Sequence, residues 1–376
     1  MILLILLINN KEATKNMDKL STKHFTFFIL GSSLIAIKSY SSIFINMGGR
    51  DTWLLFLISS LIFSIAFLYL INISKYNLDI KEIFLSLNTF GKFLLYIFGL
   101  GLFFISVESA SVLSSSIHSN FFLSTPIWYC LVFFLICTSY VLYKNFNSIL
   151  ILVLITVFST LIGDIILFIL IGKYLDLSYL LPIMDNGISY DKILAITLML
   201  GSLSSICISL PYLKLISSKK GLIKHSTIAL IICFSIIVSS LISTISFFGP
   251  VRAGNIFYPE FVQSQRVQIA DFLEFGELFY IFKNVCMWFI KYILASYSII
   301  LLFKDIINNK KIFIIIYSFI VFIVSWYITQ NQYHFFQWLK ILQLCLFLTL
   351  LITPILGFTI YKFKNNKSRK EHFNGR

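Results

Sequence analysis

Apolar residues in this sequence gather into long runs, separated by short polar stretches that hold most of the charged side chains. Each run has about 18 to 25 residues, enough for a helix to cross a hydrocarbon layer roughly 30 Å thick. A β-barrel would show short segments of alternating polarity instead. The pattern therefore predicts an all-α integral membrane protein with ten spans, at residues 25–45, 53–73, 93–117, 127–144, 148–171, 193–216, 226–248, 284–303, 312–329 and 336–361.

Composition agrees with the apolar pattern. Of the 376 residues, 58% are hydrophobic and only 12% are charged. A soluble domain has no interior large enough for that much apolar surface, so the chain is expected to lie in a lipid bilayer. The net charge of +14 could suggest a nucleic-acid partner. Its distribution fits membrane topology instead, and no nucleic acid is expected.

Basic residues alternate between the two sides of the predicted spans. The side that includes both termini has 21 Lys and Arg residues, the opposite side has 6, and Lys38, Lys291 and Lys340 fall within spans. Cytoplasmic segments of membrane proteins carry the excess of positive charge. Both termini are therefore expected in the cytoplasm, which also requires an even number of spans.

The domain organisation is simple. Residues 17–376 are predicted to form a single polytopic membrane domain. Residues 1–16 are interpreted as an extension or a start-site artefact, because Met1 to Ile8 is apolar but too short to span. Met17 begins a more natural N-terminus, although the sequence alone does not decide between the two starts.

One polar stretch, residues 249–283, interrupts the apolar pattern on the predicted outer side. Gly249-Pro250 ends the seventh span, because proline cannot continue a helix. From Phe261 onward apolar residues recur at helical spacing, which predicts a short amphipathic helix in the outer membrane interface. A plain connector between two spans is an equally good interpretation.

Three ionisable residues lie within the spans at similar depth. Lys38, Glu108 and Asp164 are roughly 20 to 24 Å from the cytoplasmic ends of their helices, at about 1.5 Å per residue. A charge there costs at least a few kcal/mol unless it is paired or hydrated, which favours functional roles. A structural Lys38–Glu108 pair is the alternative. For Lys291, a stem that extends to the interface is favoured.

No catalytic residue, metal site or cofactor is predicted. The six cysteines are scattered singly through apolar runs, and the five histidines have no paired spacing. Neither pattern is typical of a metal site or a disulfide framework. Phosphate-binding and nucleophile motifs are also missing from the sequence, so an enzyme is not expected.

Several segments together resemble the spore germination permease-like family, the B subunits of endospore germinant receptors. The outer stretch FYPEFVQSQRVQIADFLEFGELF is similar to the outer loop of that family. Gly49-Arg50-Asp51 with Trp53, Glu108, Thr125-Pro126-Ile127, and Leu210-Pro211 before Lys219-Lys220 resemble its spans two, three, four and six. The resemblance covers nearly the whole chain from about residue 17. The sixth span departs from it, being rich in serine and lacking an acidic residue, which leaves the ligand type open.

The resemblance implies the fold of the amino acid–polyamine–organocation transporters. These proteins have two inverted five-helix repeats, here expected at about 25–171 and 193–361, with spans one and six broken near the membrane centre. Glycine and serine gather at both places, although such residues are also usual at close helix contacts. The residues expected to bind a ligand are Gly31, Ser32, Ser33, Lys38, Glu108, Gly201, Ser202, Ser204 and Ser205.

The resemblance also implies a function. A B subunit would bind a small nutrient germinant, expected to be an amino acid, in the spore inner membrane. It would pass the signal to an A subunit and a lipoprotein C subunit. The alternative is an amino acid or cation-coupled symporter of the same fold, since a broken-helix pocket serves both functions.

Overall fold

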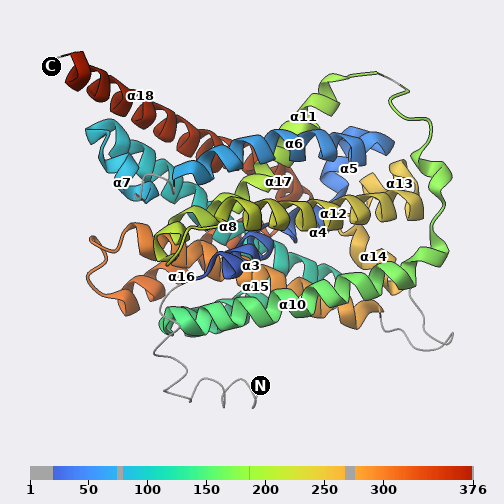
Figure 1. The fold of residues 1–376 in the computed structure, drawn as a ribbon. Helices are drawn as coiled ribbons and strands as arrows, with labels where there is room; N and C mark the ends of the chain where they lie inside the picture. Colours follow the sequence, from blue (N-terminus) through green and yellow to red (C-terminus); the bar gives the residue numbers. More distant parts are fainter. Residues whose placement is uncertain (1–19, 74–78, 186, 267–275, 375–376) are drawn as a thin grey trace.

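The computed structural model describes residues 20–73, 79–185, 187–266 and 276–374, with only the backbone described for 366–374. Within these ranges the chain is helical and contains no strand, and a single bridge pairs Leu20 with Ile216. Figure 1 shows the long helices α6, α8, α10, α12 and α15 running side by side in roughly one direction. The all-α prediction is confirmed.

The helices follow the predicted order. They are α3 (Thr22–Ser33), α4 (Ala36–Ser39), α5 (Ser42–Gly48), α6 (Thr52–Ile71), α7 (Ile80–Leu85), α8 (Asn88–Asn120), α9 (Ile127–Tyr143), α10 (Phe146–Ile171), α11 (Tyr190–Leu203), η5 (Ser204–Leu215), α12 (Leu222–Phe248), α13 (Pro250–Asn255), α14 (Pro259–Gln265), α15 (Gly276–Leu302), α16 (Lys310–Ile328), α17 (Gln332–Leu346), η6 (Phe347–Ile352) and α18 (Thr353–Asn374). Short 3-10 turns η1 (Gly49–Asp51), η3 (Gly172–Tyr174) and η4 (Leu177–Leu180) link some of them.

Eight helical stretches in the described part of the chain are long and apolar enough to cross a membrane. Two of the ten predicted spans are not among them. The fourth coincides with α9, whose 17 residues are slightly short, and the first is divided among α3, α4 and α5. The protein is thus a multi-pass membrane protein, and the ten-helix inverted-repeat arrangement stays a prediction.

The first span is broken twice. α3 ends at Ser33, where the Ser32 and Ser33 hydroxyls both donate to the Ile29 carbonyl at 2.9 Å. Such side-chain bonds compete with the backbone bonds that would continue a helix. α4 then has only four residues, and Tyr40 follows it in a non-helical conformation, φ −121° and ψ 46°. The break therefore lies immediately after the predicted Gly31-Ser32-Ser33 cluster.

The sixth span changes its helix type midway. It is α-helical to Leu203 and then a 3-10 helix, η5, of 12 residues that contains Pro211. A 3-10 helix rarely exceeds four residues and often marks a hinge. The Ser204, Ser205 and Ser209 hydroxyls each donate to the carbonyl three residues earlier, which favours this tighter winding. The serine-rich cluster therefore coincides with the change.

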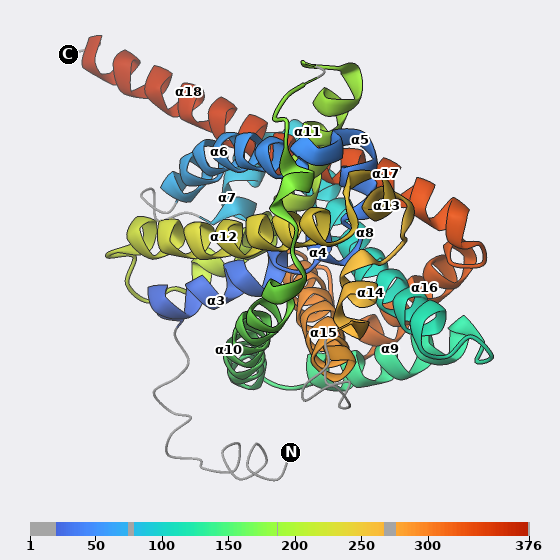
Figure 2. The same cartoon turned by 90° about the vertical axis from the view of Figure 1, so that its right-hand side faces the viewer.

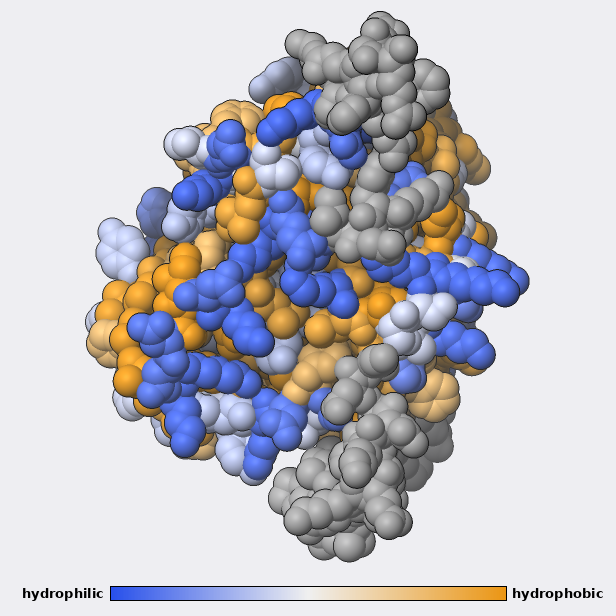
Figure 3. All heavy atoms as spheres, turned by 60° about the vertical axis from the view of Figure 1, so that its left-hand side comes forward, coloured by the Kyte–Doolittle hydropathy of each residue, from blue (hydrophilic) through white to orange (hydrophobic). Residues whose placement is uncertain are grey.

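Polar surface gathers at one end of the helix bundle. Figure 3 shows hydrophilic side chains over the end that carries the α12 start and the α15–α16 turn, with hydrophobic side chains along the flanks. Exposed lysines at this end include Lys214, Lys220, Lys224 and Lys304. Apolar flanks and a basic end are what a bilayer requires of its proteins.

The described part of the 249–283 stretch forms two short helices, α13 and α14, before α15 begins. Its polar residues Glu260 and Gln263 are buried. Figure 2 shows α14 beside α15, inside the outline of the bundle. The predicted amphipathic helix depends on Ile269, Phe272 and Leu273, which lie outside the described residues.

Candidate functional site

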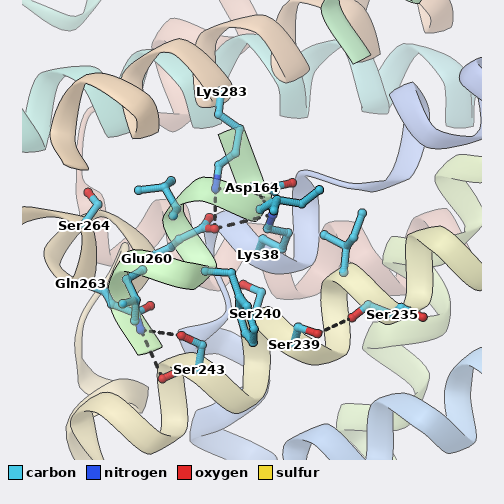
Figure 4. A pocket seen from close by; sticks show the side chains of 15 residues that line it. Lys38, Asp164, Ser235, Ser239, Ser240, Ser243, Glu260, Gln263, Ser264 and Lys283 are labelled. Carbon is cyan, nitrogen blue, oxygen red and sulfur yellow. Dashed lines mark hydrogen bonds and ion pairs between the residues drawn. The ribbon is translucent and has the colours of Figure 1, made fainter. Parts of the chain in front are cut away.

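Four charged side chains meet inside the bundle, and we call them the four-charge cluster: Lys38, Asp164, Glu260 and Lys283. They come from α4, α10, α14 and α15, four elements far apart in sequence. Figure 4 shows the four side chains pointing toward one another. Lys38 is 3% exposed and Lys283 is 2% exposed, so both ammonium groups have left water. Such charges persist only when they are paired.

The pairing is tight and shared. Lys38 Nζ lies 2.5 Å from Asp164 Oδ1 and 3.7 Å from Glu260 Oε1. Lys283 Nζ lies 3.1 Å from Asp164 Oδ1 and 2.6 Å from Glu260 Oε1. Each carboxylate therefore uses one oxygen to bridge the two lysines. Glu260 Oε2 is buried and has no hydrogen-bond partner among the described residues.

Two anchors hold α14 so that Glu260 reaches the cluster. On one side the Tyr258 hydroxyl donates to Ser115 Oγ of α8 at 2.9 Å. Burial raises the pKa of Tyr258, so the hydroxyl keeps the proton it donates. On the other side Gln263 Nε2 donates to Ser243 Oγ of α12 at 2.7 Å. A segment that the sequence assigns to an outer loop thus delivers a buried carboxylate to the helix core.

A cavity of about 210 Å³ adjoins the four-charge cluster. All four charged residues line it, and Gln263 and Ser264 of α14 join them. The α12 wall is a row of hydroxyls, at Ser235, Ser239, Ser240 and Ser243, which Figure 4 shows below the charges. The cavity therefore combines paired charges, hydroxyl groups and an apolar wall from α10, a mixture typical of small-molecule sites.

A second buried network surrounds Glu108, and we call it the Glu108 cluster: Tyr40, Glu108, Lys291 and Gln343. Lys291 Nζ lies 2.8 Å from Glu108 Oε2, and both side chains are fully buried. The other oxygen, Oε1, accepts from Tyr40 Oη at 2.5 Å and from Gln343 Nε2 at 3.1 Å. Glu108 does not line the cavity beside the four-charge cluster. The carboxylate is instead held by three donors from three elements.

The structure changes the predicted pairing of the buried charges. Lys38 pairs with Asp164 rather than with Glu108, so the alternative Lys38–Glu108 pair was wrong. Lys291 does not extend to the interface, because it is 0% exposed and bound to Glu108. Of the three residues predicted at similar depth, Lys38 and Asp164 meet, whereas Glu108 pairs with Lys291 instead.

The predicted glycine and serine residues lie at the breaks, but they contact protein in this structure. A Cβ on Gly201 would be 1.9 Å from the Gln343 carbonyl oxygen, and one on Gly31 would be 2.9 Å from Ile290 Cγ2. Ser204 Oγ bonds to carbonyl oxygens of Gly201 and Leu346. Among the predicted binding residues, Lys38 alone lines the cavity beside the four-charge cluster. Ligand binding by the others stays a prediction.

Alanine substitutions separate packing from ligand contact at these glycines. Gly201→Ala forces a Cβ against backbone and is expected to destabilise the protein by about 1–3 kcal/mol. Gly31→Ala should cost less, because the Ile290 side chain can move. Gly163→Ala is the matched control, with nothing within 4 Å of its Cβ. Immunoblots measure the amount of protein in the membrane, and thermal melting measures its stability. A Gly201→Ala protein with normal melting but no ligand response would contradict the packing role.

Sequence reasoning missed Glu260, Lys283, Tyr40 and Gln343. The first two were counted with the outer polar segments, because nothing in the local pattern shows that α14 folds back into the bundle. Lys283 and Lys291 are eight residues apart on α15, about 12 Å along one helix. That spacing on an apolar helix was an available signal for two charged sites at different depths.

These features define a multi-pass, all-helical membrane protein whose first span is broken beside two buried charge clusters. The sequence model of the spore germination protein family matches residues 19–333. The match covers most of the chain and includes all of the four-charge cluster, and the chain belongs to this family of spore germination proteins. No curated protein matches the chain.

Proposed function

We propose that this chain is the membrane subunit of a nutrient germinant receptor and binds an amino acid at the four-charge cluster. Family membership supports the germination role. The observation that carries the binding site is the buried, cavity-lining cluster at the broken first span. The cavity of about 210 Å³ lies below the range of about 300–1,000 Å³ common for drug-sized ligands, so it suits a small molecule.

The charge balance of the cluster favours a zwitterion. Two lysines and two carboxylates sum to zero, and an amino acid adds one charge of each sign without changing that sum. Its carboxylate would take a place between Lys38 and Lys283, and its ammonium would reach Glu260 Oε2, the buried oxygen without a described partner. An ion of net charge would leave an unbalanced charge in low dielectric, which costs several kcal/mol.

The position of α4 offers a way to pass the signal on. This four-residue helix lies between the two breaks of the first span. Lys38 at its centre belongs to the four-charge cluster, and Tyr40 at its end belongs to the Glu108 cluster. A ligand that takes Lys38 from Asp164 would move α4 and strain the Tyr40–Glu108 bond. The displacement would then reach α8 and α17, and through them an A subunit and a lipoprotein C subunit in the spore inner membrane.

Spores test this function directly. Spores whose only receptor of this kind contains this chain should germinate with a subset of amino acids, and removal of the chain should abolish that response. The neutral double variant Lys38→Met/Asp164→Asn should accumulate but not respond. Germination that proceeds unchanged without the chain would contradict the proposal.

The symporter alternative rests on the two broken spans, which transporters of this architecture also have. Uptake separates the two functions. Vesicles containing this chain alone should bind a radiolabelled amino acid without accumulating it inside if the chain is a receptor subunit. Accumulation that depends on an ion gradient would favour the symporter.

Both termini are proposed to lie in the cytoplasm, with α13 and α14 on the outer side. Val251 of α13 is 78% exposed and is the appropriate labelling position, whereas Gln263 is buried. A Val251→Cys protein should react with a membrane-impermeant maleimide added outside intact cells. A cysteine in place of Lys220, at the basic end, should react only after the membrane is opened. The reverse pattern would overturn the orientation.

A further inference from the structure

A second, apolar cavity of about 780 Å³ lies on the flank of the bundle between α9 and α10. Its floor is α8 and α15, and Figure 2 shows α15 between the two walls. The residues Lys144 and Asn145 join α9 to α10 at one end. From that end the groove runs past Cys137 and Leu152 toward Thr125 and Tyr129 at the start of α9. None of the described residues that line it is charged.

The lining decides what can fill this groove. Aromatic rings form much of the lining. The ring centroids of Phe134 and Phe289 lie 6.2 Å apart in an edge-to-face arrangement. Water would find few partners there, since Thr125, Tyr129 and Thr156 supply all of the side-chain hydroxyls in the described lining. An empty void would forfeit the dispersion contacts of the whole lining. The groove is therefore suited to an apolar occupant rather than to water.

The position of the groove identifies that occupant. Phe133 and Ile136 of α9 are 54% and 63% exposed, so this flank faces the hydrocarbon of the bilayer. Trp128 and Tyr129 at the start of α9 are about half exposed, as are aromatic side chains at a membrane–water interface. The groove thus begins at head-group level and continues inward along the hydrocarbon.

We propose that one acyl chain of a membrane phospholipid occupies this groove as a resident ligand, with its head group at the start of α9. This acyl chain lies against Val285, Cys286 and Phe289 of α15, the helix that also carries Lys283 and Lys291. Lipid occupancy would therefore hold α15 in the position that both charge clusters need. The inference is independent of the identity of the germinant.

Photo-crosslinking tests the site. The protein is reconstituted with phosphatidylglycerol that bears a diazirine midway along one acyl chain, irradiated and mapped by peptide mass spectrometry. Adducts should concentrate on groove residues of α9, α10 and α15. They should fall to the level of an unirradiated sample in Cys130→Trp and in Thr156→Phe, which fill the groove from opposite walls. Ile169→Phe, exposed on α10 away from the groove, should change nothing. Adducts spread evenly over lipid-facing residues would indicate ordinary boundary lipid and overturn the proposal.

A measurement on the unmodified protein covers the case in which the filling variants fail to fold. Cys130, Cys137 and Cys286 line the groove, and Cys345 on α17 does not. In detergent without lipid, methyl methanethiosulfonate should modify the three groove thiols. Adding phosphatidylglycerol should slow the modification of these three thiols more than that of Cys345. If the modification of all four thiols is slowed equally, or is not slowed at all, no acyl chain resides in the groove.

Discussion

Replacing Lys291 with Met is expected to remove most of the protein from the membrane. The substitution leaves the Glu108 carboxylate fully buried without its cation, and breaking a buried pair costs about 3–5 kcal/mol. That loss is a large share of the stability of a typical domain. Membrane immunoblots and thermal melting of the purified protein measure the effect.

The double variant Lys291→Met/Glu108→Gln shows whether the Glu108 cluster is structural or also acts on a ligand. It removes both charges, while the amide oxygen of the introduced glutamine remains an acceptor for Tyr40 and Gln343. If the cluster is structural, accumulation and germinant response should both return. Normal accumulation with lost response would instead support the predicted ligand-binding role of Glu108. Normal accumulation of Lys291→Met alone would contradict the buried pair seen here.

Neutralising Lys38 and Asp164 together is expected to abolish the amino acid response without removing the protein. Lys38→Met alone leaves two carboxylates with one lysine and should lower accumulation. Lys38→Met/Asp164→Asn restores the charge balance and keeps the Lys283–Glu260 pair, which is 2.6 Å long. The ligand carboxylate loses Lys38, one of its two proposed partners, at about 2–5 kcal/mol for a buried pair, so the dose–response should shift by more than tenfold. A normal dose–response in this double variant would place the ligand elsewhere.

Much of the fold could be predicted because it depends on local composition. Apolar runs mark the long helices, and Gly31-Ser32-Ser33 and Gly201-Ser202 mark the places where helical hydrogen bonding changes. The first span was predicted with one break near the membrane centre, whereas the second break, at Tyr40, was not predicted, because hydropathy does not register a short break within an apolar run. α9 has only 17 residues, because Pro126 precedes its first residue and the chain turns at Lys144.

The candidate site was only partly predictable. Depth along a helix brought Lys38 and Asp164 to the same level, and they meet. Glu260 could not be placed in the same way, because its position depends on α14 being drawn inward by Tyr258 and Gln263. Lys291 was assigned to the interface because its partner lies 183 residues earlier in the chain. Charge pairing across helices is a tertiary property that single-span arguments cannot supply.

Direct binding to the purified protein in lipid nanodiscs tests the central claim, that the four-charge cluster receives an amino acid. Each standard amino acid is tested by thermal melting, and any that stabilises the protein is compared with its methyl ester and its des-amino acid. A ligand at 100 times its Kd should stabilise the folded protein by about 2.7 kcal/mol. The proposal predicts stabilisation by the zwitterion, none by either analogue, and none in Lys38→Met/Asp164→Asn. Equal stabilisation by an analogue, or an undiminished effect in the double variant, would contradict it.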